Sequence, residues 1–369
     1  MRGAQVWKAG LIAALLTFAL AVGPAAAKKG DIIVGDSNTA EVIRVNPNTG
    51  AKDVISDDSR FNSPNDVVFG PKRMYVADYQ AFDGGGGVFS VNPKTGATAV
   101  VSDDPLFDQP DGIAMGPDGD LYVTDLDSPE GALFRVDLPS GATAPVTDDP
   151  LLASPVGVVV PPSGDPVVAT FSQLVARVDA TTGNVTTIVD DGDGFEGGAG
   201  LARGPDGTLY AGEQNGFIDA IDPLTGAFSR VADAPDYDGY GLAFDAKRRI
   251  VFGDGADVYE ANLGTGDSKR VASDFGYPEG FEVEPPKCKG KYATIVGSTK
   301  KDKLKGSKFK DVIHALGGKD KVSAKGGNDI VCGGKGKDKL KGGGGKDKLL
   351  GQGGRDKLDG GPGRDKEQQ

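Results

Sequence analysis

The sequence predicts an all-β chain, a six-bladed β-propeller followed by a C-terminal parallel β-roll. Two internal repeats of different length carry this prediction. Between residues 31 and 285 a set of apolar strands recurs about every 43 residues, and from residue 297 onward a nine-residue pattern returns eight times. We expect three segments, namely a signal peptide (1–27), the propeller (28–286) and the roll (287–369).

The first 27 residues have the layout of a secretory signal peptide. Arg2 and Lys8 precede an apolar stretch from Leu11 to Val22, and Pro24 followed by three alanines forms a small-residue cleavage site. The mature chain should therefore begin near Lys28 and be secreted by a Sec-type route. No other window is apolar enough to predict a membrane span.

The long repeat has the composition of a propeller blade. A turn motif of the general form Asp/Asn-(Pro)-x-Thr-Gly closes each repeat, and a strand pair around a Gly-Pro-Asp-Gly type turn precedes it from the second repeat on, as in QPDGIAMGPDGDLYVTD (residues 109–125). Four strands per repeat indicate one blade each. The motif ends at Gly50, Gly96, Gly141, Gly183, Gly226 and Gly266.

The first long repeat lacks its innermost strand, and the missing strand predicts how the ring closes. The segment YPEGFEVEP (residues 277–285) follows the sixth repeat and matches the start of the other inner strands. We expect it to complete the first blade, which removes exposed sheet edges.

The nine-residue repeat predicts calcium-binding turns. Its eighth position is apolar in the first seven units, so each short strand sends one side chain into a shared interior. Its glycines permit positive φ, and carboxylates together with backbone carbonyls suit a hard cation such as Ca²⁺. The sixth position is Asp302, Asp311, Asp320, Asp329, Asp338, Asp347, Asp356 and Asp365.

The units differ, and the differences rank the expected sites. The fourth position is Lys300 and Phe309 in the first two units and glycine in the other six, so Asp302 and Asp311 should bind weakly or not at all. We expect several calcium ions, each held by turns eighteen residues apart on one edge, such as those of Asp329 and Asp347. The main ligands are then the aspartates of the last six units, Asp320, Asp329, Asp338, Asp347, Asp356 and Asp365.

These nonapeptides resemble the hemolysin-type (RTX) calcium-binding repeats over residues 297–367. The stretch CKGKYATIVG (residues 288–297) is similar to the version of that module found in Sec-exported bacterial proteins. The resemblance implies a module that is disordered without calcium and folds on binding it. Mutual repulsion of many lysines and a core of one aliphatic residue per unit agree with that expectation.

Two cysteines in an exported chain suggest a bridge between Cys288 and Cys332. In a regular roll, strands two layers apart would lie about 9.6 Å from each other, which exceeds the limit of about 7 Å for a disulfide. Either the segment around Cys288 folds back over the roll or the pair stays reduced. We favour the bridge.

The propeller repeats resemble the NHL and SMP-30/gluconolactonase superfamily over residues 31–285, and that resemblance implies a channel metal held by Glu, Asn and Asp at the starts of inner strands. Glu279, Asn65 and Asp111 match these positions, although their order around the ring departs from the family's. We favour the alternative in which Asn65 and Asp111 bond to neighbouring turns and Glu279 faces channel water. The six ring positions are Asn65, Asp111, Val156, Ala199, Tyr240 and Glu279.

Charge and composition narrow the function. The sole histidine, His314, lies in a roll repeat, so a Ser-His-Asp hydrolase would lack its base. Lys287 onward holds 22 Lys and Arg against 10 Asp and Glu, which gives +12 there and −24 in residues 1–286 of a chain whose net charge is −12. A propeller this acidic should not bind nucleic acid.

The sequence thus predicts a secreted calcium-binding protein in which the propeller is a binding or scaffold module. The alternative is a metal-dependent lactonase or hydrolase in the propeller channel, and the evidence leans away from an enzyme. Besides calcium, an anionic cell-surface polymer or an unidentified protein on the propeller face is the expected partner of a monomeric chain. The sequence leaves the propeller's substrate or partner open.

Overall fold

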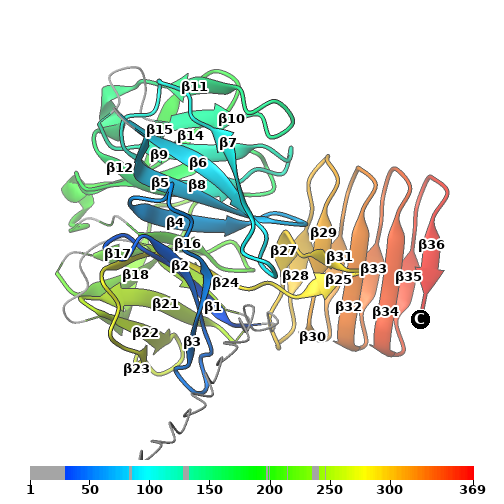
Figure 1. The fold of residues 1–369 in the computed structure, drawn as a ribbon. Coiled ribbons are helices and arrows are strands. Elements are labelled where there is room, and N and C mark those ends of the chain that lie inside the picture. The colour runs from blue at the N-terminus through cyan, green and yellow to red at the C-terminus, as the bar shows by residue number, and fades with distance from the viewer. Residues whose placement is uncertain are drawn as a thin grey trace, which may run out of the picture.

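Six four-stranded antiparallel sheets form a ring, and two parallel sheets form a roll beside it (Figure 1). This computed structural model describes residues 30–82, 85–127, 133–196, 198, 200–213, 215–234, 241–245 and 247–369. The expected all-β class, a six-bladed propeller followed by a parallel β-roll, is confirmed. The predicted signal peptide, residues 1–27, lies outside the described residues.

Each blade contributes one sheet to the ring, with the strand nearest the channel named first. The first blade contains β24 (Pro278–Val283), β1 (Ile32–Asp36), β2 (Glu41–Val45) and β3 (Lys52–Ser56), and the second contains β4 (Pro64–Phe69), β5 (Met74–Phe82), β6 (Gly85–Val91) and β7 (Thr98–Ser102). The third contains β8 (Pro110–Met115), β9 (Leu121–Asp125), β10 (Leu133–Val136) and β11 (Thr143–Thr147), and the fourth contains β12 (Pro155–Val159), β13 (Val167–Thr170), β14 (Leu174–Val178) and β15 (Val185–Val189). The fifth contains β16 (Leu201–Arg203), β17 (Leu209–Glu213), β18 (Phe217–Ile221) and β19 (Phe228–Asp233), and the sixth contains β20 (Leu242–Phe244), β21 (Arg249–Asp254), β22 (Asp257–Asn262) and β23 (Ser268–Ala272).

The ring closes as the sequence predicts. Strand β24 pairs antiparallel with β1, with Val34 opposite Phe281, so the last propeller strand completes the first blade. Two short 3-10 helices, η1 (Pro150–Leu152) and η2 (Asp191–Asp193), lie between blades. Within the described ranges, no helix has the length and apolar character that crossing a bilayer requires.

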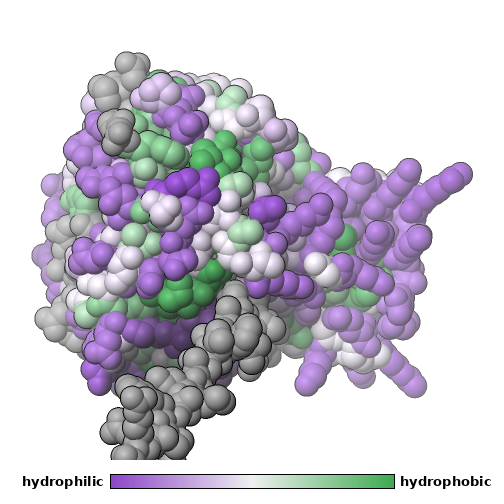
Figure 2. Space-filling model, viewed as in Figure 1, coloured by the Kyte–Doolittle hydropathy of each residue, from purple (hydrophilic) through white to green (hydrophobic). Residues whose placement is uncertain are grey.

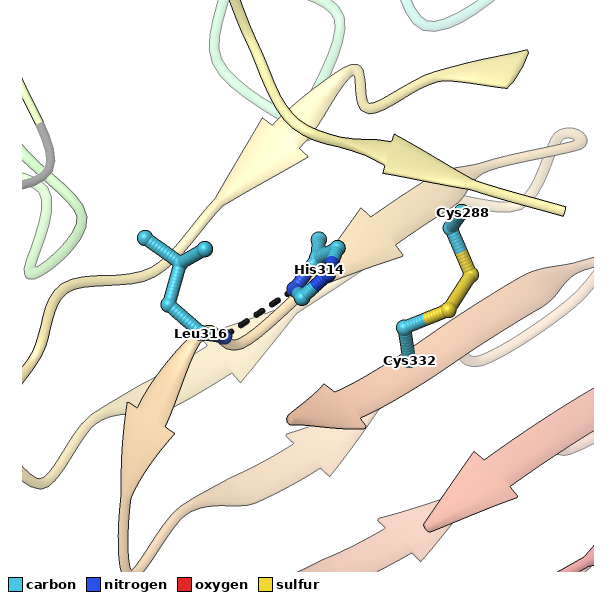
Figure 3. Close-up of a disulfide and its surroundings, with 4 residues drawn as sticks. All are labelled: Cys288, His314, Leu316 and Cys332. Atoms are coloured by element: carbon cyan, nitrogen blue, oxygen red, sulfur yellow. Dashed lines mark hydrogen bonds between the residues drawn. A yellow bond between two sulfur atoms is a disulfide. The ribbon is translucent and has the colours of Figure 1, made fainter. Parts of the chain in front are cut away.

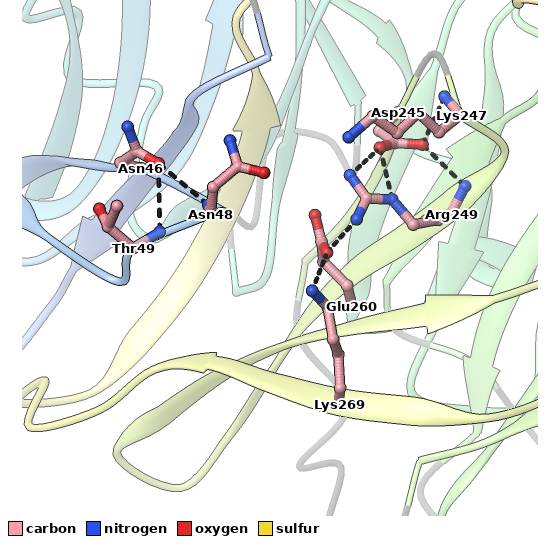
Figure 4. A network of polar contacts seen from close by, with 8 residues as sticks. All are labelled: Asn46, Asn48, Thr49, Asp245, Lys247, Arg249, Glu260 and Lys269. Atoms are coloured by element: carbon pink, nitrogen blue, oxygen red, sulfur yellow. Dashed lines mark hydrogen bonds and ion pairs between the residues drawn. The ribbon is translucent and has the colours of Figure 1, made fainter.

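The turn motif requires its glycine because that residue packs against the backbone of the neighbouring blade. Gly96 has φ +71°, and a Cβ there would lie 2.1 Å from the Ile55 carbonyl oxygen on the outer strand of the preceding blade. The first motif residue also organises its turn, since the Asn46 side chain accepts from the N–H groups of Asn48 and Thr49 (Figure 4). A larger residue than glycine would push the blades apart.

Apolar clusters fill the six seams between neighbouring blades. In the seam between the second and third blades, Phe107 packs edge-on against Phe134 with ring centroids 5.5 Å apart. A polar network supports the sixth blade, where Arg249 is bidentate to Asp245 and also pairs with Glu260 (Figure 4). Burial in every seam makes the ring one cooperative body.

Buried aspartates in second strands fix where inner strands begin. Asp78 accepts from the N–H groups of Asn62 and Ser63, just ahead of β4. Asp36 and Asp125 do the same in the first and third blades, accepting from the two residues at the lead-in to β24 and β8. These bonds set the channel mouth at which Asn65 and its ring neighbours lie.

The roll is a stack of two parallel sheets that share one apolar column. Leu304 stacks on Val322 in one sheet, and Ile313 stacks on Val331 in the other. The one-aliphatic-per-unit interior is therefore as predicted. One sheet contains β28 (Lys303–Lys305), β31 (Lys321–Ser323), β33 (Lys339–Lys341) and β35 (Lys357–Asp359), and the other contains β27 (Ile295–Val296), β29 (Val312–His314), β30 (Gly317–Gly318), β32 (Ile330–Gly336), β34 (Lys348–Gly354) and β36 (Lys366–Gln368).

A linking hairpin, β25 (Lys287–Cys288) and β26 (Lys291–Tyr292), joins the two bodies. Tyr292 belongs to the core seam of the first and second blades, with its ring centroid 4.7 Å from that of Phe69. Its hydroxyl donates to Glu284 Oε1 at 3.0 Å, and its N–H donates to the Pro71 carbonyl at 3.1 Å. The base of the roll is thus anchored in the propeller by a buried aromatic side chain.

Candidate metal sites

Each edge of the roll is a stack of turns in which one carboxylate oxygen serves the backbone. Asp347 Oδ1 accepts from the N–H of Asp329 at 2.9 Å, and Asp338 Oδ1 accepts from the N–H of Asp320 at 2.9 Å. The same bond joins aspartates eighteen residues apart along both edges, from Asp302 to Asp356 and from Asp311 to Asp365. This ladder of bonds aims every carboxylate into the turn that surrounds it.

The other carboxylate oxygen of five of these aspartates is buried and has no hydrogen-bond partner among the described residues. A buried anionic oxygen without a partner is costly, and a cation removes that cost. Asp329 is 0 % exposed, and Asp338 and Asp347 are each 1 % exposed. The five orphaned atoms are the Oδ2 atoms of Asp320, Asp329, Asp338, Asp347 and Asp356.

The backbone of these turns forms a cradle that has no room for a side chain. Gly336 has φ +147°, and a Cβ on it would lie 1.7 Å from the carbonyl oxygen of Gly318 in the preceding turn of the same edge. Gly345 has the same relation to Gly327, also at 1.7 Å. Carbonyl oxygens therefore crowd the fourth position. The orphaned Oδ2 atoms lie nearer the first position, where a Cβ on Gly333 would lie 2.8 Å from Asp338 Oδ2 and 2.9 Å from the Gly351 carbonyl oxygen. This is the oxygen-rich setting that Ca²⁺ prefers.

The second position of these turns is also left-handed, even where it is not glycine. Leu316, Lys325 and Gln352 have φ of 71°, 73° and 73°. Such a conformation strains a residue with a Cβ, and strain of this kind persists where the surrounding structure requires it. The third, fourth and seventh units therefore adopt the same turn as the glycine-rich ones.

The first two turns are built differently, with serine in the second position. Asp302 Oδ2 accepts from the N–H of Ser298 at 2.6 Å and from its hydroxyl at 3.0 Å. Asp311 Oδ2 accepts from the N–H and hydroxyl of Ser307 at 2.7 Å and 3.1 Å. In these two turns a serine supplies the bonds that the later turns lack.

Raised pKa values distinguish Asp320 and Asp329 from ordinary surface aspartates. Burial raises the pKa of Asp329 to about 7, and the charges of Asp311 and Asp347 add to the rise. Burial likewise raises the pKa of Asp320 to about 6. The protein thus holds these carboxylates where burial disfavours the charged form, a cost that a bound cation would offset.

Polar side chains of residues 365–369 bond to the turns of both edges. Gln369 Oε1 accepts from the N–H of Asp356 at 3.2 Å, the position that another repeat's aspartate would take. Glu367, in the eighth position where other units are apolar, accepts from the N–H of Gly360 at 2.7 Å. Asp365 accepts from the N–H of Asp347, and its own turn is the last of its edge.

At the channel mouth, Asn65, Glu279 and Asp111 come from adjacent blades, and the amide of Asn65 lies against Glu279. With its nitrogen toward Glu279, the amide donates to Glu279 Oε2 at 2.9 Å and to the Ser63 carbonyl at 2.9 Å. The reverse orientation would set the amide oxygen against both of these acceptors. Burial, followed by the nearby charge of Asp125, raises the pKa of Asp111 to about 7.

This donor set does not fit a cation as the residues stand. A metal needs the Asn65 oxygen, but the hydrogen-bonded orientation presents the nitrogen. Of the remaining ring positions, Val156 is apolar, and Ala199 and Tyr240 lie outside the described residues. The channel site at Glu279, Asn65 and Asp111 stays a prediction.

Two further acids lie deeper in the channel, and sequence reasoning missed them. Burial raises the pKa of Asp66 to about 8 and that of Glu282 to about 7. Asp66 accepts from the N–H groups of Val67 and Ile113. Both acids line a cavity of about 1140 Å³ that extends from the channel to the first turns of the roll. No motif marks them, because their positions read as ordinary alternating strand residues.

The two cysteines form a disulfide between the linking hairpin and the roll (Figure 3). Cys288 lies across β29 and β32, with its Cα 5.8 Å from that of Cys332. The hairpin folds back over the sheet, so the predicted bridge is confirmed without the long layer-to-layer distance. His314 lies nearby and accepts from the N–H of Leu316 through Nδ1 at 3.1 Å (Figure 3).

Comparison with known families and structures agrees with this division into two bodies. Residues 296–331 and 333–367 match the RTX calcium-binding nonapeptide repeat, four copies of which make up that family's unit. The predicted resemblance is thereby confirmed, and the C-terminal body is a calcium-binding RTX repeat module. No curated protein matches the chain.

Solved structures similar to the chain share its propeller fold. A chain in the crystal structure of a nidogen/laminin complex is 12% identical with a TM-score of 0.58, over 69% of this chain and 97% of that one. TolB from Acinetobacter baumannii is 15% identical with a TM-score of 0.50, over 69% of this chain and 66% of that one. Streptogramin B lyase is 12% identical with a TM-score of 0.49, over 69% and 83%. At such identities the likeness shows the fold alone.

Proposed function

We propose that the chain is a secreted calcium-binding protein whose RTX turns fold on binding Ca²⁺, with the propeller as a binding or scaffold module. One observation carries the proposal, namely the five buried carboxylate oxygens that have no hydrogen-bond partner among the described residues. They stack along the two edges of the roll beside crowded carbonyl oxygens. Calcium is the cation whose preferred ligands match this set.

The residues that would hold calcium are stacked along both edges of the roll. On one edge Asp320, Asp338 and Asp356 alternate with the carbonyls of the glycine turns, and on the other Asp329 and Asp347 do so. Bound calcium supplies positive charge to these carboxylates. Metal binding free energy is then folding free energy, because the ligands are brought together only in the stacked state.

The serine turns divide the roll into two parts. Asp302 and Asp311 have their oxygens bonded to Ser298 and Ser307, so the first two turns depend less on a cation to offset a buried charge. Tyr292 anchors the same end in the propeller, and the disulfide ties the linking hairpin to Cys332 in the fourth unit. We infer that calcium acts on the turns from the third unit onward, and that the base of the roll is ordered without it.

Secretion rests on the predicted signal peptide together with the disulfide, which persists in oxidising compartments. Extracellular calcium suits modules whose affinity is about 10⁻⁴ to 10⁻³ M. For the propeller, no donor set in the described channel favours catalysis over binding.

Hydrogen exchange of the mature full-length chain tests the proposal. In millimolar calcium, amides of residues 315–369 should gain strong protection relative to chelator, whereas the propeller strands and residues 288–314 should change little. Magnesium at the same concentration should protect weakly, because it demands a smaller octahedral site and sheds water reluctantly. Identical exchange in calcium and chelator would end the proposal.

A further inference from the structure

One face of the roll presents lysines in a straight, in-register column. Lys303, Lys321, Lys339 and Lys357, which we call the lysine ladder, occupy the same strand position in β28, β31, β33 and β35. All four side chains are exposed. Their backbones follow each other at about 4.8 Å, the spacing of neighbouring strands. Figure 2 shows hydrophilic side chains standing out from the roll.

The ladder is not explained by the stability of the fold. Like charges on directly neighbouring strands are destabilising. The ion pairs found in the described parts of the chain all lie between residues 31 and 284, so none of them compensates the ladder. The interior of the roll is filled from the eighth position of each repeat and makes no demand on the ladder position.

The opposite sheet shows that lysine is not a general requirement of this position. There the equivalent residues are Val312, Ile330, Lys348 and Lys366, and the first two are buried with Cys288 beneath the linking hairpin. The chain therefore covers one face of the roll and leaves the lysine face open. A second column, with Lys305 and Lys341, runs beside the ladder on the open face.

We propose that the lysine ladder binds a linear acidic polysaccharide, a polymer with one carboxylate on each sugar. A straight row of single positive charges complements a straight chain of single negative charges, and each lysine is a point charge without the forked geometry that arginine offers to phosphate. The strands of this face, KLK, KVS, KLK and KLD, carry no aromatic ring on which a nucleobase could stack.

This inference rests on the proposed function, because the ladder is straight only when the strands are stacked. Calcium then acts twice, by bringing the lysines into register and by neutralising the carboxylates along both edges. We expect polysaccharide binding to require calcium and to weaken steeply with added salt.

The test uses the mature full-length protein and a fluorescent heptamer of galacturonate, followed by fluorescence anisotropy in calcium at low salt. Lys→Gln replacement of the four ladder residues is compared with a matched variant that loses the same charge from the covered side and its turns. The ladder variant is Lys303→Gln, Lys321→Gln, Lys339→Gln and Lys357→Gln, and the matched variant is Lys310→Gln, Lys346→Gln, Lys348→Gln and Lys366→Gln.

The ladder variant should bind about tenfold or more weakly, while the matched variant should stay within about twofold of wild type. Equal losses in both variants, no binding by calcium-folded wild type, or tighter binding of a DNA oligonucleotide would each overturn the inference. Hydrogen exchange on the same samples separates the two proposals. If the roll is equally protected in chelator, the calcium proposal fails, and the ladder proposal survives only if the ladder variant still loses binding.

Discussion

Replacing Asp329 by asparagine should change the stability of the roll in opposite directions with and without calcium. Asp329 Oδ1 accepts from the N–H of Asp311 at 2.9 Å, and the amide oxygen of an asparagine can keep that bond. Its nitrogen would replace the orphaned Oδ2, which has no hydrogen-bond partner among the described residues. Without calcium, the substitution therefore removes an unpaired buried charge and adds a donor.

The magnitude follows from the raised pKa. Burial takes the pKa of Asp329 from 3.8 to about 7, which corresponds to about 4 kcal/mol at full strength and to about 2 kcal/mol once screening by nearby water is allowed for. In chelator, Asp329→Asn should therefore stabilise the outer turns by about 2 kcal/mol. In calcium it should destabilise them, since loss of a charged ligand weakens that site by about 100-fold or more.

Asp311→Asn is the matched control on the same edge. Asp311 Oδ2 accepts from the N–H of Ser307, so an amide nitrogen there would face another donor. This variant should destabilise the roll similarly in calcium and in chelator. Local opening free energies from hydrogen exchange of β32 and β34 measure both effects. If Asp329→Asn lowers stability in chelator as much as Asp311→Asn does, the orphaned oxygens are not cation ligands and the reasoning is wrong.

Three further outcomes follow from the same structure. Ser307→Ala should destabilise the base of the roll by about 1–3 kcal/mol and leave the calcium midpoint unchanged, as judged by exchange in a calcium titration. Reducing Cys288–Cys332, which closes a 44-residue separation, should cost about 4 kcal/mol in thermal unfolding of the roll. The pKa of Asp66 is raised in the fold to about 8 from 3.8, so its stabilising effect is complete below about pH 4 and lost as pH rises through about 8. Asp66→Asn should make the melting temperature of the propeller fall less between about pH 4 and pH 8. An unchanged dependence of the melting temperature on pH would contradict the raised pKa of Asp66.

The propeller was predictable because its evidence is periodic. Six glycine turns at a spacing of about 43 residues fix the number of blades, and the glycine at position 96 is required by a carbonyl of the preceding blade. The closing strand was identifiable because the first repeat lacks one. Nothing local, however, marks Tyr292 as part of the propeller core, since its partners Phe69 and Pro71 are far away in sequence.

In the roll, too, the sequence predicted the repeat but not the hydrogen bonds of individual carboxylates. The nine-residue period locates every aspartate, but it does not show which carboxylate oxygens have partners. Ser298 and Ser307 occupy the second position of the first two units, and their role depends on a hydroxyl lying within reach of the aspartate four residues on. The Gly-Ser start of both units was the available signal. The orientation of the Asn65 amide was not readable at all, because it is decided by Glu279 from another blade.

The position of the serine turns determines which part of the protein should respond to calcium. Tyr292 joins the propeller to the base of the roll, where the first two turns already have their carboxylates bonded to serine, and the disulfide reaches Cys332 in the fourth unit. The orphaned oxygens begin at Asp320, beyond the serine turns. Calcium therefore has differential contacts with the outer roll and none with the junction, and a ligand can shift only an equilibrium in which it has such contacts. The lysine face should respond to calcium while the propeller seams stay as they are.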